Sequence, residues 1–214
     1  MPKDSQFKNQ ADEIKYWNEF YKNHHEKQLQ DPSEFAKFIS AQKLPVSRLI
    51  EVGCGNGRDT IFLSKLFQTV VGIDTSPEAI AYCKQRHQAP NINFINSIFA
   101  PNVDDILNLT LNSPVLVYGR FLLHALDSQE EADLLKNAST MLSHGSYLAF
   151  EYRTTSDEKN KKTFGNHFRR YIKHDQLCDK LKDLGFKIIF ENESDSFAQF
   201  AGEKSNIGRC IARI

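Results

Sequence analysis

Gly53, Gly55 and Gly57 stand at alternate positions directly after the apolar run Arg48–Val52. Glycine lets the backbone turn sharply and lets a ligand approach without an intervening β-carbon. A helix is expected to follow over Arg58–Phe67, with its unpaired N–H groups directed at that ligand. The segment predicts a nucleotide-binding turn between a strand and a helix, although the same glycine pattern also occurs in tight turns that bind nothing.

A carboxylate follows at a position suited to ribose recognition. Asp74 ends the next apolar run, Thr69–Ile73, and lies 17 residues beyond Gly57. Its oxygens can accept hydrogen bonds from both ribose hydroxyls; the alternative is that Asp74 only begins a turn. The spacing G-x-G-x-G, with Glu51 two residues before Gly53, differs from the G-x-G-x-x-G of dinucleotide-binding folds. An NAD-dependent oxidoreductase therefore fits less well, and a non-catalytic nucleotide-binding partner protein is the other alternative.

The run Glu51–Gly57 resembles the first motif of class I S-adenosylmethionine-dependent methyltransferases, which reads acid-x-G-x-G-x-G. The resemblance covers roughly Arg48–Phe150 and implies that S-adenosylmethionine is the cofactor, with its methionine part beside this motif and its ribose on Asp74. After the third strand the family often has an acid that contacts adenine, but here Asn96 and Ser97 stand instead, so main-chain groups nearby are expected to bind adenine. The cofactor-binding residues that the resemblance implies are Trp17, Glu51, Gly53, Cys54, Gly55, Gly57, Arg58, Asp74, Thr75, Ser76, Ser97, Ile98 and Gly119.

Two further segments offer side chains for a methyl acceptor. Arg120 follows the fourth apolar run, and a helix beginning near it would place His124 on the same face, one turn away. The segment Gly165–Tyr171 interleaves arginines with a histidine and aromatic residues. Guanidinium groups bind carboxylate or phosphate through paired hydrogen bonds, so both segments predict an anionic acceptor, with a solvated charged surface as the alternative. The predicted acceptor-binding residues are Arg120, Glu151, Arg153, His167, Arg169, Arg170 and Tyr171, with Arg170 preferred over Arg169.

Histidine is the side chain best suited to proton transfer near neutral pH, so His124 and His167 are the candidate catalytic bases. An alcohol acceptor requires such a base, whereas a carboxylate oxygen does not. The alternative for His124 is a packed polar residue. The sequence therefore leaves open whether a general base is used, and also whether oxygen or nitrogen is methylated.

The same segments look like a narrower group of small bacterial methyltransferases that are associated with surface-polysaccharide genes. Shared features are an aromatic N-terminal helix at Tyr16–Tyr21, the stretch Pro32–Ala36, the R-F-x-L-H-A and G-x-H-x-R-R-Y segments, and the late residues Glu203 and Arg209. The resemblance implies an anionic small molecule or a glycan precursor as the substrate. The N-terminal aromatic residues are either core or a lid that excludes water from the cofactor.

The elements that must position these residues alternate between apolar strands and helices, which predicts a doubly wound, mostly parallel α/β sheet. The last two strands, separated only by a loop, are expected to pair as an antiparallel hairpin at one edge. Ser76 before Pro77, and Ser128 with Glu131, are predicted helix caps, and Gly185 is the predicted end of a helix that starts near Asp175. The seven predicted strands are Arg48–Val52, Thr69–Ile73, Ile92–Ile95, Val115–Tyr118, Tyr147–Tyr152, Lys187–Phe190 and Cys210–Ile214.

A length of 214 residues suits one domain, divided here into an N-terminal helical lid (1–45), a cofactor-binding core (46–150) and a substrate side (151–214). Twenty-seven basic and 27 acidic residues give a formal net charge of zero, which excludes a broad nucleic-acid-binding field. The four cysteines are scattered, so free thiols, no metal site and a cytoplasmic location are expected. No membrane span is expected, the charged stretch Asp157–Lys162 is predicted to be an exposed loop, and the oligomeric state is open.

Overall fold

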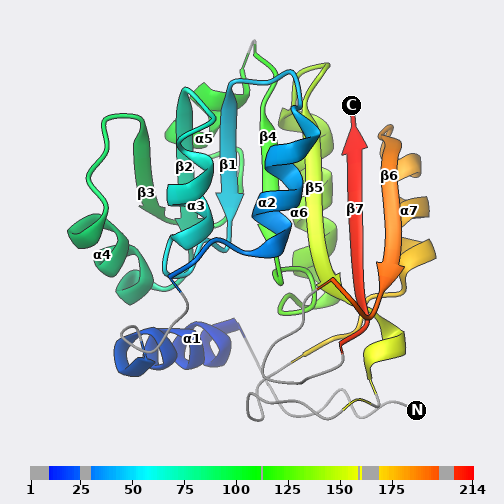
Figure 1. Ribbon diagram of the computed structural model, residues 1–214, viewed down its shortest axis with the longest axis horizontal. Helices are drawn as coiled ribbons and strands as arrows, with labels where there is room; N and C mark the ends of the chain where they lie inside the picture. The colour runs from blue at the N-terminus through cyan, green and yellow to red at the C-terminus, as the bar shows by residue number, and fades with distance from the viewer. Residues whose placement is uncertain (1–9, 25–29, 112, 159, 161–168, 198–204) are drawn as a thin grey trace.

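The computed structural model describes residues 10–24, 30–111, 113–158, 160, 169–197 and 205–214 (Figure 1). Within them, seven strands form one sheet in the order β3-β2-β1-β4-β5-β7-β6. Neighbouring strands are parallel except that β7 runs antiparallel to both β5 and β6. The strands are β1 Arg48–Val52, β2 Thr69–Asp74, β3 Ile92–Asn96, β4 Leu116–Arg120, β5 Tyr147–Arg153, β6 Lys187–Ser194 and β7 Ile207–Arg213. The helices are α1 Gln10–His24, α2 Glu34–Gln42, α3 Arg58–Leu63, α4 Pro77–Arg86, α5 Asp104–Thr110, α6 Ser128–Met141 and α7 His174–Asp183, with a short 3₁₀ helix at Thr155–Asp157.

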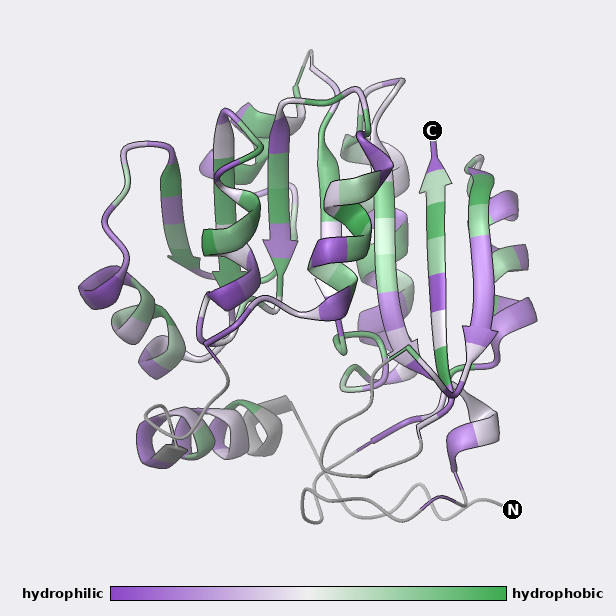
Figure 2. Ribbon diagram, in the orientation of Figure 1, coloured by the Kyte–Doolittle hydropathy of each residue, from purple (hydrophilic) through white to green (hydrophobic). Residues whose placement is uncertain are grey.

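Helices cover both faces of the sheet, so its central strands are buried on both sides and are apolar along most of their length (Figure 2). One cluster of buried side chains joins the sheet to α5, α6 and α7, and a second joins its other face to α2 and α3. Side chains turn hydrophilic at the lower end of β5 in Figure 2, which is its carboxyl end. Helix α1 lies beyond this carboxyl edge (Figure 1). The core therefore leaves the carboxyl edge of the sheet polar, and α1 lies next to this edge.

The doubly wound sheet and the C-terminal antiparallel pair are confirmed. Strand β7 begins at Ile207, three residues earlier than predicted, and lies between β5 and β6. This insertion makes β6 the edge strand and buries β7 on both sides. No helix among the described residues is both long and apolar enough to cross a bilayer.

Two of the predicted helix caps are confirmed and one is wrong. The Ser76 hydroxyl accepts a hydrogen bond from the Ala79 amide at 3.2 Å, and Gly185 has a positive φ of 90° after α7. The capping box of α6 is formed by Asp127 and Glu130, one residue before the predicted pair. Glu131 does not cap this helix because it is buried against α7 and binds cations there.

Two local predictions also fail. Arg120 is the last residue of β4 and not the start of a helix, because Phe121 has a positive φ of 55° and the chain then turns. Asp157 is buried, closes the 3₁₀ helix and pairs with Arg153 at 2.6 Å, so it is not part of an exposed loop. The end of the predicted charged loop, 161–162, lies outside the described residues.

Candidate functional site

The glycine turn connects β1 to α3 in a conformation that requires glycine. Gly53, Gly55 and Gly57 have φ values of 74°, 54° and 75°, a region that residues with a β-carbon rarely adopt. A β-carbon on Gly55 would lie 2.4 Å from the Tyr21 hydroxyl oxygen. The turn is therefore approached closely by α1, at the point where the sequence places the cofactor.

Asp74 ends β2 directly beside this turn. One carboxylate oxygen accepts the Gly55 amide at 2.9 Å and the other accepts the Ser76 amide at 2.9 Å. The side chain is buried, and burial raises the pKa of its carboxyl group. Asp74 thus fixes the turn to the start of α4 at the end of the second strand.

Glu51 supplies a second buried carboxylate on the other side of the turn. It accepts a hydrogen bond from the Thr60 hydroxyl of α3. Burial, with the nearby Asp59 carboxylate adding to it, raises the pKa of Glu51 well above its ordinary value. Glu51 and Asp74 together give the surroundings of the glycine turn acceptors that favour hydroxyl or cationic partners.

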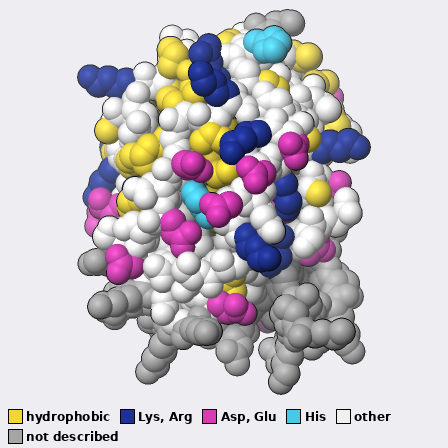
Figure 3. All heavy atoms as spheres, turned by 90° about the vertical axis from the view of Figure 1, so that its right-hand side faces the viewer, with side chains coloured by type: hydrophobic (Ala, Val, Ile, Leu, Met, Phe, Trp, Pro, Cys, Tyr) yellow, Lys and Arg dark blue, Asp and Glu magenta, His cyan; other side chains and the backbone are white. Residues whose placement is uncertain are grey.

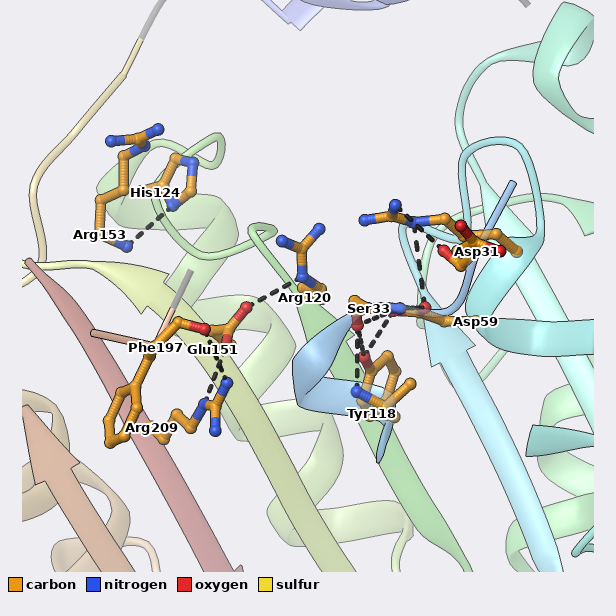
Figure 4. Close-up of polar contacts among 12 residues, drawn as sticks. Asp31, Ser33, Asp59, Tyr118, Arg120, His124, Glu151, Arg153, Phe197 and Arg209 are labelled. Carbon is orange, nitrogen blue, oxygen red and sulfur yellow. Dashed lines mark hydrogen bonds and ion pairs between the residues drawn. The ribbon is translucent and has the colours of Figure 1, made fainter. Parts of the chain in front are cut away.

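Sequence reasoning missed Asp59, which anchors the N-terminal part of the chain to the site. Its carboxylate accepts the Ser33 amide at 2.7 Å, the Ser33 hydroxyl at 2.6 Å and the Tyr118 hydroxyl at 2.7 Å (Figure 4). All three residues are buried. Ser33 falls inside the stretch Pro32–Ala36 that the resemblance had singled out, so this stretch holds α2 against the cofactor turn.

Helix α1 contacts the same edge through the side-chain amide of Asn18, and its aromatic rings pack against one another. Asn18 accepts hydrogen bonds from the Ser76 hydroxyl and the Glu78 amide, both at 3.2 Å. The Trp17 ring lies 5.6 Å from the Phe20 ring and 6.2 Å from the Tyr21 ring, measured between centroids. The two Asn18 hydrogen bonds place α1 against the turn between β2 and α4.

The remaining predicted cofactor residues surround the ends of β2, β3 and β4. The Ser97 amide donates to the Asp74 carbonyl at 3.1 Å, and Ile98 is 52% exposed although it is apolar. Cys54 is buried, and Thr75 also donates to Asp74 through its amide. Gly119 has a packing reason to be glycine, because a β-carbon there would lie 3.0 Å from the Phe150 ring.

Arg120 begins a row of charged side chains across the ends of β4, β5 and β7. Its Nε lies 2.9 Å from one oxygen of the buried Glu151, whose other oxygen lies 2.8 Å from Nε of Arg209. The Arg120 guanidinium also stacks on Phe121, 4.1 Å from the ring centroid. Figure 4 shows it projecting beyond the carboxyl end of β4. Glu151 therefore orients Arg120 and is itself held by two cations.

A second cation lies near Arg120. Burial lowers the pKa of Arg58, and the positive charge of Arg120 lowers it further. Arg58 also donates to the Asp31 carbonyl at 3.3 Å. Two guanidinium groups that repel one another at a partly buried edge favour an anion beside them.

His124 follows the Phe121 turn and is buried. Its Nδ1 accepts the Arg153 amide at 3.2 Å (Figure 4). A ring nitrogen that accepts a backbone N–H carries no proton, so this contact assigns the proton of neutral His124 to Nε2. In that tautomer Nε2 donates a hydrogen bond and does not accept a proton.

Arg169 and Arg170, the adjacent arginines of the segment Gly165–Tyr171, contact different parts of the structure. Arg170 donates to Glu131 and to the carbonyls of Leu123 and Leu126, which ties it to α6. Arg169 instead hydrogen-bonds to Tyr171 and interacts electrostatically with Tyr16 of α1. His167, the other member of the predicted cluster, lies outside the described residues.

Residues 49–145 match a family model described as a methyltransferase domain. The matched residues include the glycine turn and Asp74, and two relatives of this chain are named as methyltransferases. TehB of Haemophilus influenzae, named as a "Probable S-adenosyl-L-methionine-dependent methyltransferase", is 23% identical over 164 residues, which are 72% of this chain and 53% of TehB. Protein 235L of Invertebrate iridescent virus 6 is 26% identical over 152 residues, which are 68% of this chain and 54% of 235L.

The chain thus spans about half the length of these two relatives. Among solved structures, an S-adenosylmethionine-dependent methyltransferase from Anabaena variabilis is similar with a TM-score of 0.71 and 19% identity, over 97% of this chain and 96% of that one. The glycopeptide N-methyltransferase MtfA gives a TM-score of 0.66 and 16% identity, over 86% and 96%. These likenesses establish the fold.

Proposed function

We propose that this protein transfers the methyl group of S-adenosylmethionine to a small anionic acceptor bound at the carboxyl ends of β4 and β5. The cofactor supplies the electrophilic methyl group, and holding it in line with the acceptor supplies much of the rate. Glu51 and the glycine turn are proposed to hold its methionine part, and Asp74 its ribose. The close approach at Gly55 and the two buried carboxylates fit such a ligand.

The observation that carries the acceptor proposal is Arg120, a partly buried cation held by Glu151 close to a second cation, Arg58. We assign Arg58 to the carboxylate of the cofactor and Arg120 to the anionic group of the acceptor. The Arg153 guanidinium pairs with the buried Asp157, and Arg169 hydrogen-bonds to Tyr171, so neither carries the acceptor proposal. Arg170 is not assigned to the proposed acceptor site, because its guanidinium binds α6.

The tautomer of His124 determines which kinds of methyl acceptor this residue can assist. A donor at Nε2 can orient an acceptor oxygen, but it does not remove a proton from an alcohol. A carboxylate oxygen is already deprotonated and needs only alignment. We therefore favour O-methylation of a carboxylate on a small molecule or glycan precursor.

The four buried free thiols support a reducing compartment such as the cytoplasm.

The test separates cofactor binding from acceptor use. S-adenosylhomocysteine affinity is measured by calorimetry, and methyl transfer is measured with labelled S-adenosylmethionine over a panel of carboxylate acceptors. Arg120→Gln keeps a hydrogen-bond donor for Glu151 but removes the charge. We expect its cofactor affinity to stay within about threefold while kcat/KM for the acceptor falls about a hundredfold, equivalent to ~2.7 kcal/mol.

Arg48→Gln is the matched control, because Arg48 is an arginine at the opposite, amino end of β1. It should change neither quantity. Absence of S-adenosylhomocysteine binding by the unmutated protein would refute the whole proposal. Equal loss of cofactor affinity and acceptor turnover in Arg120→Gln would instead assign Arg120 to the cofactor and remove the support for an anionic acceptor.

A further inference from the structure

A group of metal-ligating side chains lies away from the cofactor turn, between α7 and the β6–β7 pair. His174, Cys178 and Glu191 each offer one ligand atom, and these atoms lie within 4.8 Å of one another. Tyr152 and Cys210 adjoin them. None of these five residues belongs to the proposed cofactor site or to the proposed acceptor site.

The backbone brings the group together from three elements. His174 and Cys178 are four residues apart on α7, so their side chains share one face of the helix. Glu191 and Cys210 are directly paired across β6 and β7, so their side chains lie on the same face of the sheet. Helix α7 packs on these strands. The four side chains therefore converge because of the strand register and not because they are close in sequence.

The side chains already contact one another. Cys178 Sγ donates to a Glu191 carboxylate oxygen at 3.0 Å, and Nε2 of His174 lies 3.6 Å from the same oxygen. The thiols of Cys178 and Cys210 are hydrogen-bonded to each other. A tetrahedral zinc ion with Zn–S near 2.3 Å and Zn–N near 2.0 Å holds its ligand atoms roughly 3.3–3.8 Å apart. Small side-chain shifts thus suffice for His174, Cys178 and Glu191, and Cys210, which contacts Cys178 but lies outside that 4.8 Å group, has to turn further toward them.

The histidine ring is oriented by a residue behind it. The Tyr152 hydroxyl lies 2.8 Å from Nδ1 of His174, which leaves Nε2 facing Glu191. Such a partner on the other ring nitrogen is characteristic of metal-binding histidines. Gly208 makes room for this contact, since a β-carbon there would lie 2.5 Å from the Tyr152 ring and 3.0 Å from His174 Nδ1.

We propose that His174, Cys178, Glu191 and Cys210 bind a single Zn²⁺ ion that joins α7 to β6 and β7. Two thiolates, an imidazole and a carboxylate are a ligand set suited to this cation, and four protein ligands indicate a structural site. Binding replaces the two thiol protons, which pass to solvent. The competing explanation is a purely hydrogen-bonded cluster that binds no metal.

The site has a route for the ion to enter. Cys178 and Cys210 are buried, but the Glu191 side chain is 52% exposed and that of His174 is 12% exposed. Figure 3, which views this side of the molecule, shows several acidic side chains gathered on the surface here. A hydrated cation can therefore meet the carboxylate and the imidazole before it reaches the two sulfur atoms.

The experiment uses Co²⁺ as a spectroscopic substitute for Zn²⁺ on the full chain, freed of any histidine tag and treated with a chelator. Titration should produce a thiolate-to-cobalt charge-transfer band and the visible bands of tetrahedral Co²⁺, saturating at one ion per chain. Zn²⁺ should abolish both. Cys178→Ser should remove about half of the charge-transfer intensity, and Glu191→Gln should weaken Co²⁺ binding by about 10-fold or more.

Two control variants separate this site from other thiols and histidines. Cys83→Ser changes a buried cysteine in α4, and His144→Gln changes an exposed histidine outside the group. Both should retain the full spectrum. The proposal is overturned if the unmutated chain gives no charge-transfer band, or if Cys83→Ser reduces the band as much as Cys178→Ser does. Far-ultraviolet circular dichroism on each variant identifies loss of folding, and Glu191→Gln, at an exposed position, tests the site independently of buried changes.

Discussion

At the scale of a single residue, Glu51 is expected to lower the stability of the fold while contributing to the proposed cofactor binding. Its carboxylate is buried beside Asp59, and burial raises its pKa well above the ordinary value. A carboxyl group whose pKa is higher in the folded than in the unfolded chain takes up its proton more readily when folded. Its ionised form therefore destabilises the fold, and this cost appears as the pH rises above the ordinary glutamate pKa.

Glu51→Gln removes that cost while keeping an oxygen for the Thr60 hydroxyl. We expect the cofactor-free variant to be more stable than the unmutated protein at pH 8, because a neutral amide avoids the desolvation cost of a buried carboxylate. The gain should shrink as the pH is lowered toward 5. Urea unfolding at a series of pH values measures it.

The same variant should bind S-adenosylmethionine more weakly, by about tenfold or more, because a neutral amide attracts the cationic part of the cofactor less than a carboxylate does. Glu78→Gln, which changes an exposed glutamate near the start of α4, is the control and should alter neither quantity. A Glu51→Gln protein with unchanged stability at pH 8 would contradict the burial argument. Unchanged cofactor affinity would contradict the assignment of Glu51 to the methionine part.

At the scale of elements, we propose that α1 covers the edge of the sheet at which the cofactor is proposed to bind. Asn18 connects it to the start of α4, and Tyr21 lies against Gly55. Asn18→Ala removes both hydrogen bonds of its carbonyl oxygen. If each contributes about 1 kcal/mol when α1 is closed, S-adenosylhomocysteine should dissociate roughly thirtyfold faster. Stopped-flow fluorescence, with Trp17 on α1 as the only tryptophan, measures this rate.

Glu19→Ala is the control for this prediction, since Glu19 is exposed on the same helix. Its dissociation rate should match that of the unmutated protein. A lid function for 1–45 would be contradicted if Asn18→Ala released the cofactor at the unmutated rate, because α1 would then be packed at this edge independently of the ligand.

The elements also show why some of the site was predictable and some was not. The glycine turn and Asp74 lie within one strand–helix–strand unit, so their spacing alone indicates their proximity. The Arg120 helix was predicted wrongly because no pattern signals that Phe121 adopts a positive φ. Asp59, Ser33 and Tyr118 come from three separate elements, and only the packed fold joins them.

The cysteines are a second example of side chains that only the folded chain brings together. Their scattered positions predict free thiols without a metal, since neither Cys178 nor Cys210 has a second cysteine nearby in sequence. The pairing of Glu191 with Cys210 depends on β7 lying between β5 and β6, a strand order that the apolar runs do not specify. A group of ligands assembled by strand register is therefore invisible to motif spacing.

At the scale of the whole molecule, the two proposed ligand sites lie on different strands of one sheet, with the cofactor turn after β1 and the Zn²⁺ site on β6 and β7. Strands β1 and β6 are separated by β4, β5 and β7, which corresponds to roughly 20 Å at about 4.8 Å per strand. Effects of changes more than about 10 Å apart are usually additive. One physical link does exist, since Arg209 pairs with Glu151 and precedes Cys210 on β7.

Zn²⁺ and S-adenosylhomocysteine should therefore stabilise the fold independently. Each ligand at 100 times its Kd contributes about 2.7 kcal/mol, and each kcal/mol raises Tm by roughly 2–4 °C in a chain of this size. With both ligands present, the two stabilisation energies should add to within about 0.5 kcal/mol. Scanning calorimetry on the apo protein and the three liganded forms measures the sum.

Glu191→Gln provides the internal control, because it should remove the Zn²⁺ shift and leave the S-adenosylhomocysteine shift intact. Independence of the two sites would be refuted by a combined stabilisation that departs from the sum by more than about 1 kcal/mol. In that case the Glu151–Arg209 pair is the structural route to examine, since it is the contact that joins β7, which carries Cys210, to the strand beside Arg120. Repeating the scans on Arg209→Lys, which keeps the charge but loses the planar guanidinium, would then restore additivity if the coupling passes through that pair.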